Sequence, residues 1–580
     1  MKSKIRQIGV DMRARARRPW ALDVSWLLGG VMMIACSSSD SAPTDVGTQA
    51  DSSVASDSSA PSDSGTPSDS GMPSDSEMPS DSSTVDSPTS VPSPFNVLQY
   101  HKNASRDGLY IDPAFTKAAA AKIHLDPTFK AGIVGPTFAQ PLYFDGGPRG
   151  KSLVIAATEQ NLVYALDAAT GSEVWQTRVA GDPQDAPVPR ALMPCGGEID
   201  PFGITGTPVI DAATRTIYLD GMTSSDGGMT KKHKIFALSL DDGSKRAGWP
   251  VDTSTLKSGS TSLLSQYQSQ RAALALVGDT LYVPYGGLAG DCGTYHGWVI
   301  AVPIANPAAP RVYATIAARS GIWGPGGIAS DGKSIFVTTG NAPSGSGWGH
   351  QEAVLKLQSG AVFSGQVSDY FAPSNWAALD TSDIDLGGSG PILVDVPGAT
   401  PSALVVALGK NGVMYLLDRS NLGGFGKGNG GTGEGLASAQ VAGGAIIQAA
   451  VSYTTSQGTY VVLRAAGLGC PAGQSGDLVG VRISATSPPA PTVAWCAQQG
   501  GYGSPIVTTT DGHGDAVIWT LATGTTTRLL AFDGDTGAVV FAGGTPGDVM
   551  LSTSKFVTPI ASKGRIFVAA DSAVYAFAMP

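Results

Sequence analysis

A strand-turn-strand pattern recurs along most of this chain and limits the folds that are open to it. In its clearest copy, at residues 162–175, a short apolar strand leads into an Asp-x-x-Thr-Gly turn and a second strand containing tryptophan. Related segments lie at residues 235–243, 414–419, 530–537 and 574–577. Short strands separated by Gly, Asp and Asn turns indicate an all-β fold, and repetition of one unit indicates that many copies pack side by side.

Each unit opens with an entry strand such as Thr-Pro-Val-Ile at 207–210 or Ser-Pro-Ile-Val at 504–507. Counting these strands with their partners gives eight units, at residues 138–180, 203–253, 270–317, 322–368, 386–424, 443–498, 501–544 and 556–580. The last unit is short, so we predict that a strand from residues 95–126 completes it. Closing the ring in this way leaves no exposed sheet edge. The sequence therefore predicts an all-β, eight-bladed β-propeller over residues 95–580.

Composition and charge support this prediction and exclude one class of partner. Charged residues make up only 14% of the chain, while 75 Gly and 39 Pro supply turns. The net charge is −10, and residues 37–93 hold nine Asp, one Glu and no Lys or Arg. The remainder is mildly acidic and lacks the basic stripe that a phosphate backbone requires. We therefore expect no nucleic-acid partner.

The N-terminus has the pattern of an export signal. Seven Lys or Arg residues within positions 2–18 precede an apolar run at 24–35, which is short for a membrane span but suits a signal peptide. The sequence Met33-Ile34-Ala35-Cys36 resembles a bacterial lipobox. We predict a lipoprotein signal peptide at 1–35 and lipidation of Cys36. The alternative is an uncleaved anchor or a buried hydrophobic segment with an incidental cysteine.

Residues 36–94 are rich in Ser, Asp, Pro, Thr and Gly, and within them Asp recurs every six residues from 51 to 81. A segment of this composition cannot bury a core, and its like charges keep it extended. We predict a disordered linker that holds the folded part away from a membrane.

Four further cysteines follow Cys36, at positions 195, 292, 470 and 496. An even number outside the cytoplasm permits two disulfides. Cys470 and Cys496 are the favoured pair because both fall within one repeat unit. None of the four has the spacing of a metal-ligand set.

Three motifs carry a family resemblance. The Ala-Leu-Asp-x-x-Thr-Gly-x-x-x-Trp copy at 165–175, the Thr-Gly-Asn turn at 339–341 and Gly-Lys-Asn-Gly at 409–412 together resemble the eight-bladed quinoprotein dehydrogenases. The resemblance extends over about residues 138–580. It implies a central channel that holds pyrroloquinoline quinone (PQQ) and Ca²⁺. In such a site the cation polarises the quinone and a carboxylate removes the alcohol proton.

The same resemblance implies roles for four residues of this chain. Trp323 takes the place of the channel-floor tryptophan, Asn341 that of a calcium ligand, Asp383 that of the catalytic base and Lys410 that of a quinone-contacting cation. Their order and their gaps of 18, 42 and 27 residues are similar to those of the family.

Other features depart from the family pattern. The chain has no adjacent cysteine pair, no glutamate in a Gly-Glu context at the expected distance before Asn341, and no Trp-Asp pair at Asp383. Each predicted site residue also has a structural alternative. Trp323 can be a packing aromatic, Asn341 a left-handed turn residue, Asp383 part of an Asx-turn, and Lys410 part of a hairpin.

Two functions follow as expectations. The first is a lipid-anchored extracytoplasmic binding or scaffold module in the cell envelope of a Gram-negative-type bacterium. It would attach to the membrane through Cys36 and bind a protein or a small molecule. The alternative is a PQQ- and Ca²⁺-dependent dehydrogenase that oxidises an alcohol, sugar or polymer hydroxyl, with Asp383 as base.

Overall fold

The computed structural model describes residues 93–179, 185–345, 347–427, 434–524 and 526–580. The predicted signal peptide, Cys36 and nearly all of the predicted linker lie outside these residues. Within the described ranges, no helix is both long enough and apolar enough to span a membrane.

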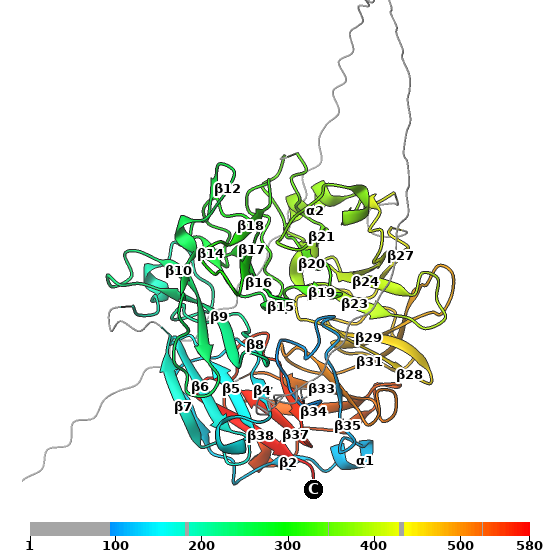
Figure 1. Ribbon diagram of the computed structural model, residues 1–580. Coiled ribbons are helices and arrows are strands. Elements are labelled where there is room, and N and C mark those ends of the chain that lie inside the picture. Colours follow the sequence, from blue (N-terminus) through cyan, green and yellow to red (C-terminus); the bar gives the residue numbers. More distant parts are fainter. Residues whose placement is uncertain (1–92, 180–184, 346, 428–433, 525) are drawn as a thin grey trace, which may run out of the picture. The chain divides into compact units, whose positions relative to one another are not determined.

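Eight sheets of four or five strands form the blades of a propeller in the described part of the chain, and they follow one another around a ring (Figure 1). The first four blades contain the following strands: β4 (Leu142–Phe144), β5 (Leu153–Ala157), β6 (Leu162–Asp167) and β7 (Glu173–Arg178); β8 (Val209–Asp211), β9 (Thr216–Thr223), β10 (Lys232–Ser239) and β11 (Val251–Asp252); β14 (Gln268–Ser269), β15 (Ala275–Val277), β16 (Thr280–Gly287), β17 (Trp298–Pro303) and β18 (Arg311–Ala314); β19 (Ala329–Ser330), β20 (Ile335–Thr338), β21 (Val354–Leu357), β22 (Tyr370–Ala372) and β26 (Gly424–Phe425).

The remaining blades contain these strands: β23 (Ile392–Asp395), β24 (Ala403–Leu408), β25 (Val413–Asp418) and β27 (Ala437–Gln440); β28 (Val451–Thr455), β29 (Gly458–Arg464), β30 (Leu478–Ile483) and β31 (Pro491–Ala497); β1 (Leu109–Ile111), β32 (Ile506–Thr509), β33 (Val517–Ala522), β34 (Arg528–Asp533) and β35 (Val539–Phe541); β2 (His124–Leu125), β3 (Ala131–Gly132), β36 (Ile560–Ser562), β37 (Arg565–Ala569) and β38 (Ala573–Ala578). The number of blades agrees with the eight predicted units, and the predicted fold class is confirmed. Two predicted bounds are wrong: the fourth blade extends beyond residue 368 to β22 and β26, which pair with each other, and the fifth extends beyond residue 424 to β27, which pairs with β25.

Short elements lie within the blades and between them. They are the helices α1 (Lys117–Ala120) and α2 (Trp376–Ser382), the two-stranded β12 (Lys257–Ser258) and β13 (Thr261–Ser262), and the 3-10 turns η1 (Pro148–Gly150), η2 (Arg190–Leu192), η3 (Thr253–Thr255), η4 (Val367–Asp369), η5 (Leu386–Gly388) and η6 (Pro546–Asp548). The first strand of each blade lies near the ring centre, as β8, β15, β19 and β23 show in Figure 1.

The Asp-x-x-Thr-Gly turn explains why the repeat folds locally. The Asp533 carboxylate accepts hydrogen bonds from the backbone N–H of Asp535 (2.9 Å) and of Thr536 (3.0 Å). Gly537 then takes a φ of 72°, which glycine adopts without steric cost. The side chain thus satisfies the backbone of the turn, so the sequence alone specifies a tight reversal.

Tryptophans couple one blade to the next through this turn. The Trp175 indole N–H donates to the Leu240 carbonyl (3.0 Å), and the Trp495 indole N–H donates to the Gly534 carbonyl (2.8 Å). A Cβ at Gly537 would lie 2.6 Å from the Trp495 ring, so glycine is also required there for the close approach of the neighbouring blade.

The ring closes through an N-terminal strand, as predicted. β2 pairs antiparallel with β38, with His124 opposite Ala578 and Leu125 opposite Phe577. β3 also pairs with β38. The last blade therefore combines strands from both ends of the folded part, and the hydrogen bonds of β2 and β3 cover the edge of its outer strand.

Residues 95–112 run through the central channel and contact the first strand of every blade, or the residues beside it, in the described structure. In blade order, the contacts join Tyr143 to Val97, Ile210 to Leu98, Leu274 to Arg106, Ser330 to Ala104, Leu393 to Ser105, Ser452 to Asp107, Val507 to Leu109 and Ser562 to Phe95. We call this segment the channel plug. The repeat pattern did not predict it.

Arg106 holds the plug at its centre and is fully buried. Its guanidinium donates to the carbonyls of Ile328 (2.7 Å), Leu274 (2.7 Å) and Tyr100 (2.8 Å). Burial lowers the pKa of Arg106 to about 10, so the group stays charged at neutral pH.

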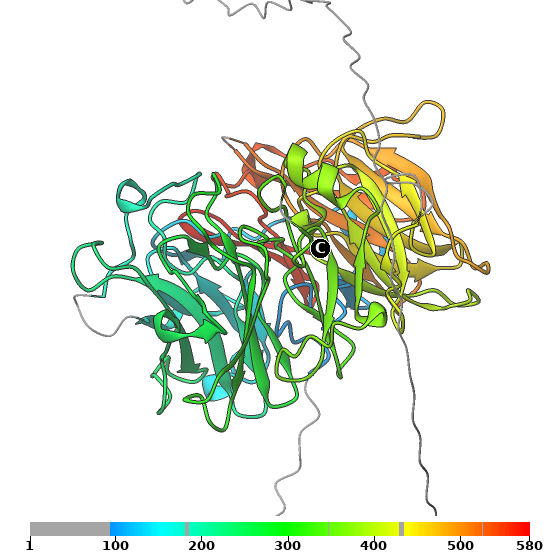
Figure 2. The same ribbon diagram turned by 90° about the horizontal axis from the view of Figure 1, so that it is seen from above.

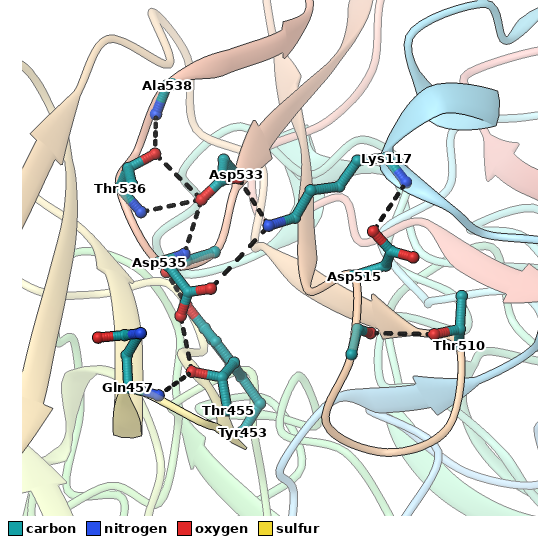
Figure 3. A network of polar contacts seen from close by, with 12 residues as sticks. Lys117, Tyr453, Thr455, Gln457, Thr510, Asp515, Asp533, Asp535, Thr536 and Ala538 are labelled. Atoms are coloured by element: carbon teal, nitrogen blue, oxygen red, sulfur yellow. Dashed lines mark hydrogen bonds and ion pairs between the residues drawn. The ribbon is translucent and has the colours of Figure 1, made fainter.

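After the plug, α1 fastens the chain to the seventh blade (Figure 3). The Lys117 ammonium lies 2.7 Å from the Asp533 carboxylate and 3.9 Å from that of Asp535. Asp535 also accepts a hydrogen bond from Thr455 of the sixth blade (2.6 Å). The turn that defines the repeat therefore serves as a contact point for the N-terminal segment.

Candidate functional site

The candidate site lies at the end of the channel where the first strands of the blades begin, which we call the entry mouth. Trp323 precedes β19, Asp385 precedes β23, and Lys410 lies in the turn between β24 and β25. The plug lies toward the other end. In Figure 2 the blue plug is seen toward the lower side of the ring, and the green helix α2 toward the upper side.

Trp323 forms one wall of the mouth and is partly exposed. The Lys410 ammonium lies 5.3 Å from the centre of its ring and the Arg271 guanidinium lies 5.0 Å from it. Each cation is attracted to the indole because the face of the ring carries partial negative charge. Glycines make room for the indole: a Cβ at Gly340 would lie 3.0 Å from its nitrogen.

Lys410 forms ion pairs with two carboxylates. It contacts Asp385, whose side chain is only 4% exposed, and it lies 3.0 Å from Asp383, whose side chain is 66% exposed. Burial alone would lower the pKa of Lys410, but these two carboxylates raise it above its ordinary value. Burial raises the pKa of Asp385, which the Lys410 ammonium partly offsets.

Asp383 ends helix α2 with a φ of 53°, in the left-handed conformation that Asp tolerates. The Asp383 side chain is largely exposed at the rim, whereas that of Asp385 is buried. Asn341 reaches this pair through its backbone, whose N–H donates to Asp385 (2.6 Å). The structure thus brings Trp323, Lys410 and Asp383 together, and it brings Asn341 beside them through a main-chain contact.

Two further buried acids lie beside this group. The Leu386 N–H donates to Glu352 (2.6 Å), whose second carboxyl oxygen is buried and has no hydrogen-bond partner. Burial, followed by the charge of Asp385, raises the pKa of Glu352 well above its usual range. Asp380 accepts from the Ala342 N–H (2.8 Å), and burial raises its pKa to about 6. Burial therefore favours the protonated form of both acids.

These acids and Arg271 were not identified from the sequence. Glu352 follows Gln351 just before an apolar strand, and Asp385 lies two residues after Asp383. Both were within reach of sequence reasoning, but only burial distinguishes Asp385 from Asp383. No motif marks Arg271, whose neighbours come from other blades.

The residues present do not fit a calcium site. Ca²⁺ takes six to eight oxygen ligands and is favoured by uncompensated carboxylates. Here the Lys410 ammonium already pairs with both Asp383 and Asp385, and Asn341 contributes a backbone donor to Asp385. Across the described ranges, no three His, Cys, Asp or Glu side chains are grouped so that they could hold a metal ion.

Two disulfides are present outside this group. Cys470 pairs with Cys496, the pair favoured from the sequence, and Cys195 pairs with Cys292. The second bridge joins two loops from different blades near the entry mouth. It fixes the loop at residues 196–199, which lines a cavity there.

Comparisons with known proteins agree with this architecture. Residues 144–306 match the family described as "Outer membrane protein assembly factor BamB". No curated protein matches the chain. In the solved structure of quinohemoprotein alcohol dehydrogenase from Comamonas testosteroni, the likeness covers 83% of this chain and 80% of that one, with 14% identity and a TM-score of 0.55.

Two other solved structures are similar to a comparable degree. They are quinohemoprotein alcohol dehydrogenase ADHIIG from Pseudomonas putida HK5 (13% identity, 84% of this chain and 80% of that one, TM-score 0.53) and a europium-containing methanol dehydrogenase (14% identity, 83% and 90%, TM-score 0.52). At such identities the likeness concerns the fold. The predicted resemblance to PQQ-type, quinoprotein-like eight-bladed propellers is confirmed at that level.

Proposed function

We propose that this chain, which has the fold of the quinoprotein alcohol dehydrogenases, is a lipid-anchored extracytoplasmic binding module with its ligand site at the entry mouth. The channel plug contacts all eight blades, so a ligand would reach the channel from the entry mouth. This mouth also gathers an indole and two cations, which are groups that recognise ligands.

The ion pairs of Lys410 favour a binding function over catalysis. Lys410 is paired with the carboxylate predicted as base, Asp383, and with its buried neighbour Asp385. A carboxylate held by an ammonium is a weaker base and a poorer metal ligand than a free one. The arrangement therefore favours a fixed recognition surface over proton abstraction.

The membrane anchor rests on the N-terminal sequence. The basic segment, the apolar run and Cys36 together support lipidation, and the acidic segment after them supports a stalk. The Cys195–Cys292 and Cys470–Cys496 bridges suit an oxidising compartment. Labelling with a radioactive fatty acid should mark the wild-type chain, and Cys36→Ser should abolish both the label and the membrane fractionation.

The rival function is a PQQ- and Ca²⁺-dependent dehydrogenase, which the fold and the closeness of Trp323, Asp383 and Lys410 favour. The test is dye-linked oxidation of alcohols and sugars by the full chain supplied with PQQ and Ca²⁺. We expect no turnover above a sample without protein. Turnover that Asp383→Asn abolishes would overturn the proposed function and assign the base to Asp383. Loss with Asp385→Asn alone would assign it to the buried carboxylate.

A further inference from the structure

A cavity of about 340 Å³ opens at the entry mouth beside Arg271, the cation that lies over Trp323. It lies between segments of four blades and is lined by both aromatic and charged side chains. Among its lining residues are Phe138, Glu198, Phe202, Arg271, Lys555 and Phe556. Its volume falls in the range of small-molecule sites.

Arg271 shares this cavity with one carboxylate, that of Glu198, and the Glu198 charge acts on Arg271 through space. Among the described residues Arg271 forms no ion pair, and its one hydrogen bond runs from Nε to the Trp323 carbonyl (3.3 Å). By contrast, Lys555 lies 3.3 Å from the Glu198 carboxylate. The two terminal guanidinium nitrogens of Arg271 are therefore available to a ligand.

The surroundings of the Arg271 guanidinium favour the binding of an anion beside it. The guanidinium lies 5.0 Å from the Trp323 ring centre and 5.4 Å from that of Phe556. Burial lowers the pKa of Arg271, yet an arginine remains charged at neutral pH. A charge that has lost much of its water is stabilised by a bound carboxylate, which the planar guanidinium can grip with two hydrogen bonds.

The rest of the wall is suited to the body of such a ligand. Phe138, Phe202 and Phe556 offer ring surfaces, and aromatic groups pack favourably against them. The facing loop is held in place, because the Cys195–Cys292 bridge ties it to the loop that carries Ala289. A site that is already ordered loses less entropy on binding.

We propose that this cavity binds a small aromatic carboxylate, with Arg271 on the carboxylate and the phenylalanines around the ring. The proposal rests on the proposed binding function and names its ligand class. Lys410 is not part of the anion contact, since Asp383 and Asp385 already neutralise it.

Isothermal titration of the full chain with benzoate, benzyl alcohol and inorganic phosphate tests the proposal. We expect benzoate to bind and the other two probes to bind at least tenfold more weakly, because each lacks either the anion or the ring. Arg271→Gln should weaken benzoate binding by roughly 10- to 100-fold, as expected for a charge-assisted contact. Arg482→Gln, at an exposed position on β30 of the sixth blade, is the matched control and should leave it unchanged.

Equal binding of benzyl alcohol would overturn the role of the anion, and equal binding of phosphate would overturn the aromatic class. Undiminished benzoate binding by Arg271→Gln would overturn the assignment to Arg271. If that variant fails to fold, the comparison of the three probes on the wild-type chain still decides. Dye-linked turnover with PQQ and Ca²⁺ would overturn the binding function without affecting these titrations, so the two failures are distinguishable.

Discussion

The ammonium group of Lys410 forms an ion pair with the buried carboxylate of Asp385 at the entry mouth. The two residues are separated by a whole strand pair, β23 and β24, and meet only because both lie at the same end of the fifth blade. Two consequences follow from this contact. It neutralises a carboxylate that would otherwise be an unpaired buried charge, and it places a cation beside Trp323.

Replacing Lys410 by methionine should destabilise the protein at neutral pH. The substitution leaves Asp385 buried without its cation, which typically costs about 3–5 kcal/mol in the free energy of unfolding. The loss should shrink on acidification, because a protonated Asp385 needs no counter-charge. Urea unfolding at pH 7 and pH 4 measures both effects.

Asp383→Asn is the matched control for that experiment. The Asp383 side chain is 66% exposed, so its pairing with Lys410 should contribute less than about 1 kcal/mol. A loss as large as that of Lys410→Met would show that Asp383, and not Asp385, is the main partner of Lys410.

Replacing Arg106 by methionine should loosen the channel plug. Three buried carbonyls lose their donor, and each unsatisfied group costs roughly 1–3 kcal/mol. We expect a lower melting temperature and new protease cleavage within residues 93–116. Arg178→Met, at an exposed position on β7, should change neither. Full protease resistance of the Arg106 variant would contradict the central role of this residue.

Glu159 should make stability depend on pH. It is fully buried between the first two blades, one of its carboxyl oxygens has no partner, and burial raises its pKa from 4.5 to about 7. The folded protein therefore holds this proton more tightly than the unfolded chain, so stability is highest below the unfolded pKa and falls as the pH rises through about 7.

Removing the Glu159 charge should restore the stability that is lost at high pH. Glu159→Gln is expected to stabilise the protein by up to about 3 kcal/mol at pH 8 and to have little effect below the unfolded pKa. Melting curves across this pH range measure the difference. Glu173→Gln, an exposed change in the same blade, should behave as the wild type does at every pH. A stabilisation that does not vary with pH would rule out titration of Glu159 as its cause.

The Cys470–Cys496 bridge should contribute to stability through the loop that it closes. The two residues are 26 positions apart. Closing a loop of this length lowers the conformational entropy of the unfolded chain, which stabilises the folded protein by about 3.5 kcal/mol. The double variant Cys470→Ala/Cys496→Ala should unfold at a correspondingly lower urea concentration. A reducing agent should shift its midpoint by less than that of the wild type, because only the Cys195–Cys292 bridge remains to be reduced. An unchanged midpoint would contradict this contribution.

Much of the site could be predicted from the sequence because its residues follow the strands that the repeat locates. Trp323 and Lys410 fall at the starts and turns of recognisable strands, so their meeting at one mouth follows from the ring. Arg271 and Glu352 could not be predicted in the same way. Arg271 is distinguished by forming no ion pair among the described residues, and Glu352 by its burial. Neither property can be read from the neighbouring residues in the sequence.

The sequence by itself determined the number of blades, most of their strands and the closure of the ring, but not the outer strands of the fourth and fifth blades. The features that it determined depend on local chemistry, namely the Asp-x-x-Thr-Gly turn and the entry strands, and on the cost of an open edge. Only the tertiary structure decided that residues 95–112 occupy the channel, that Lys410 neutralises Asp385, and that Arg271 lines a cavity without forming an ion pair in the described part of the chain. Charge pairing and burial are set by segments from different blades, and their relative placement exists only once the ring has formed.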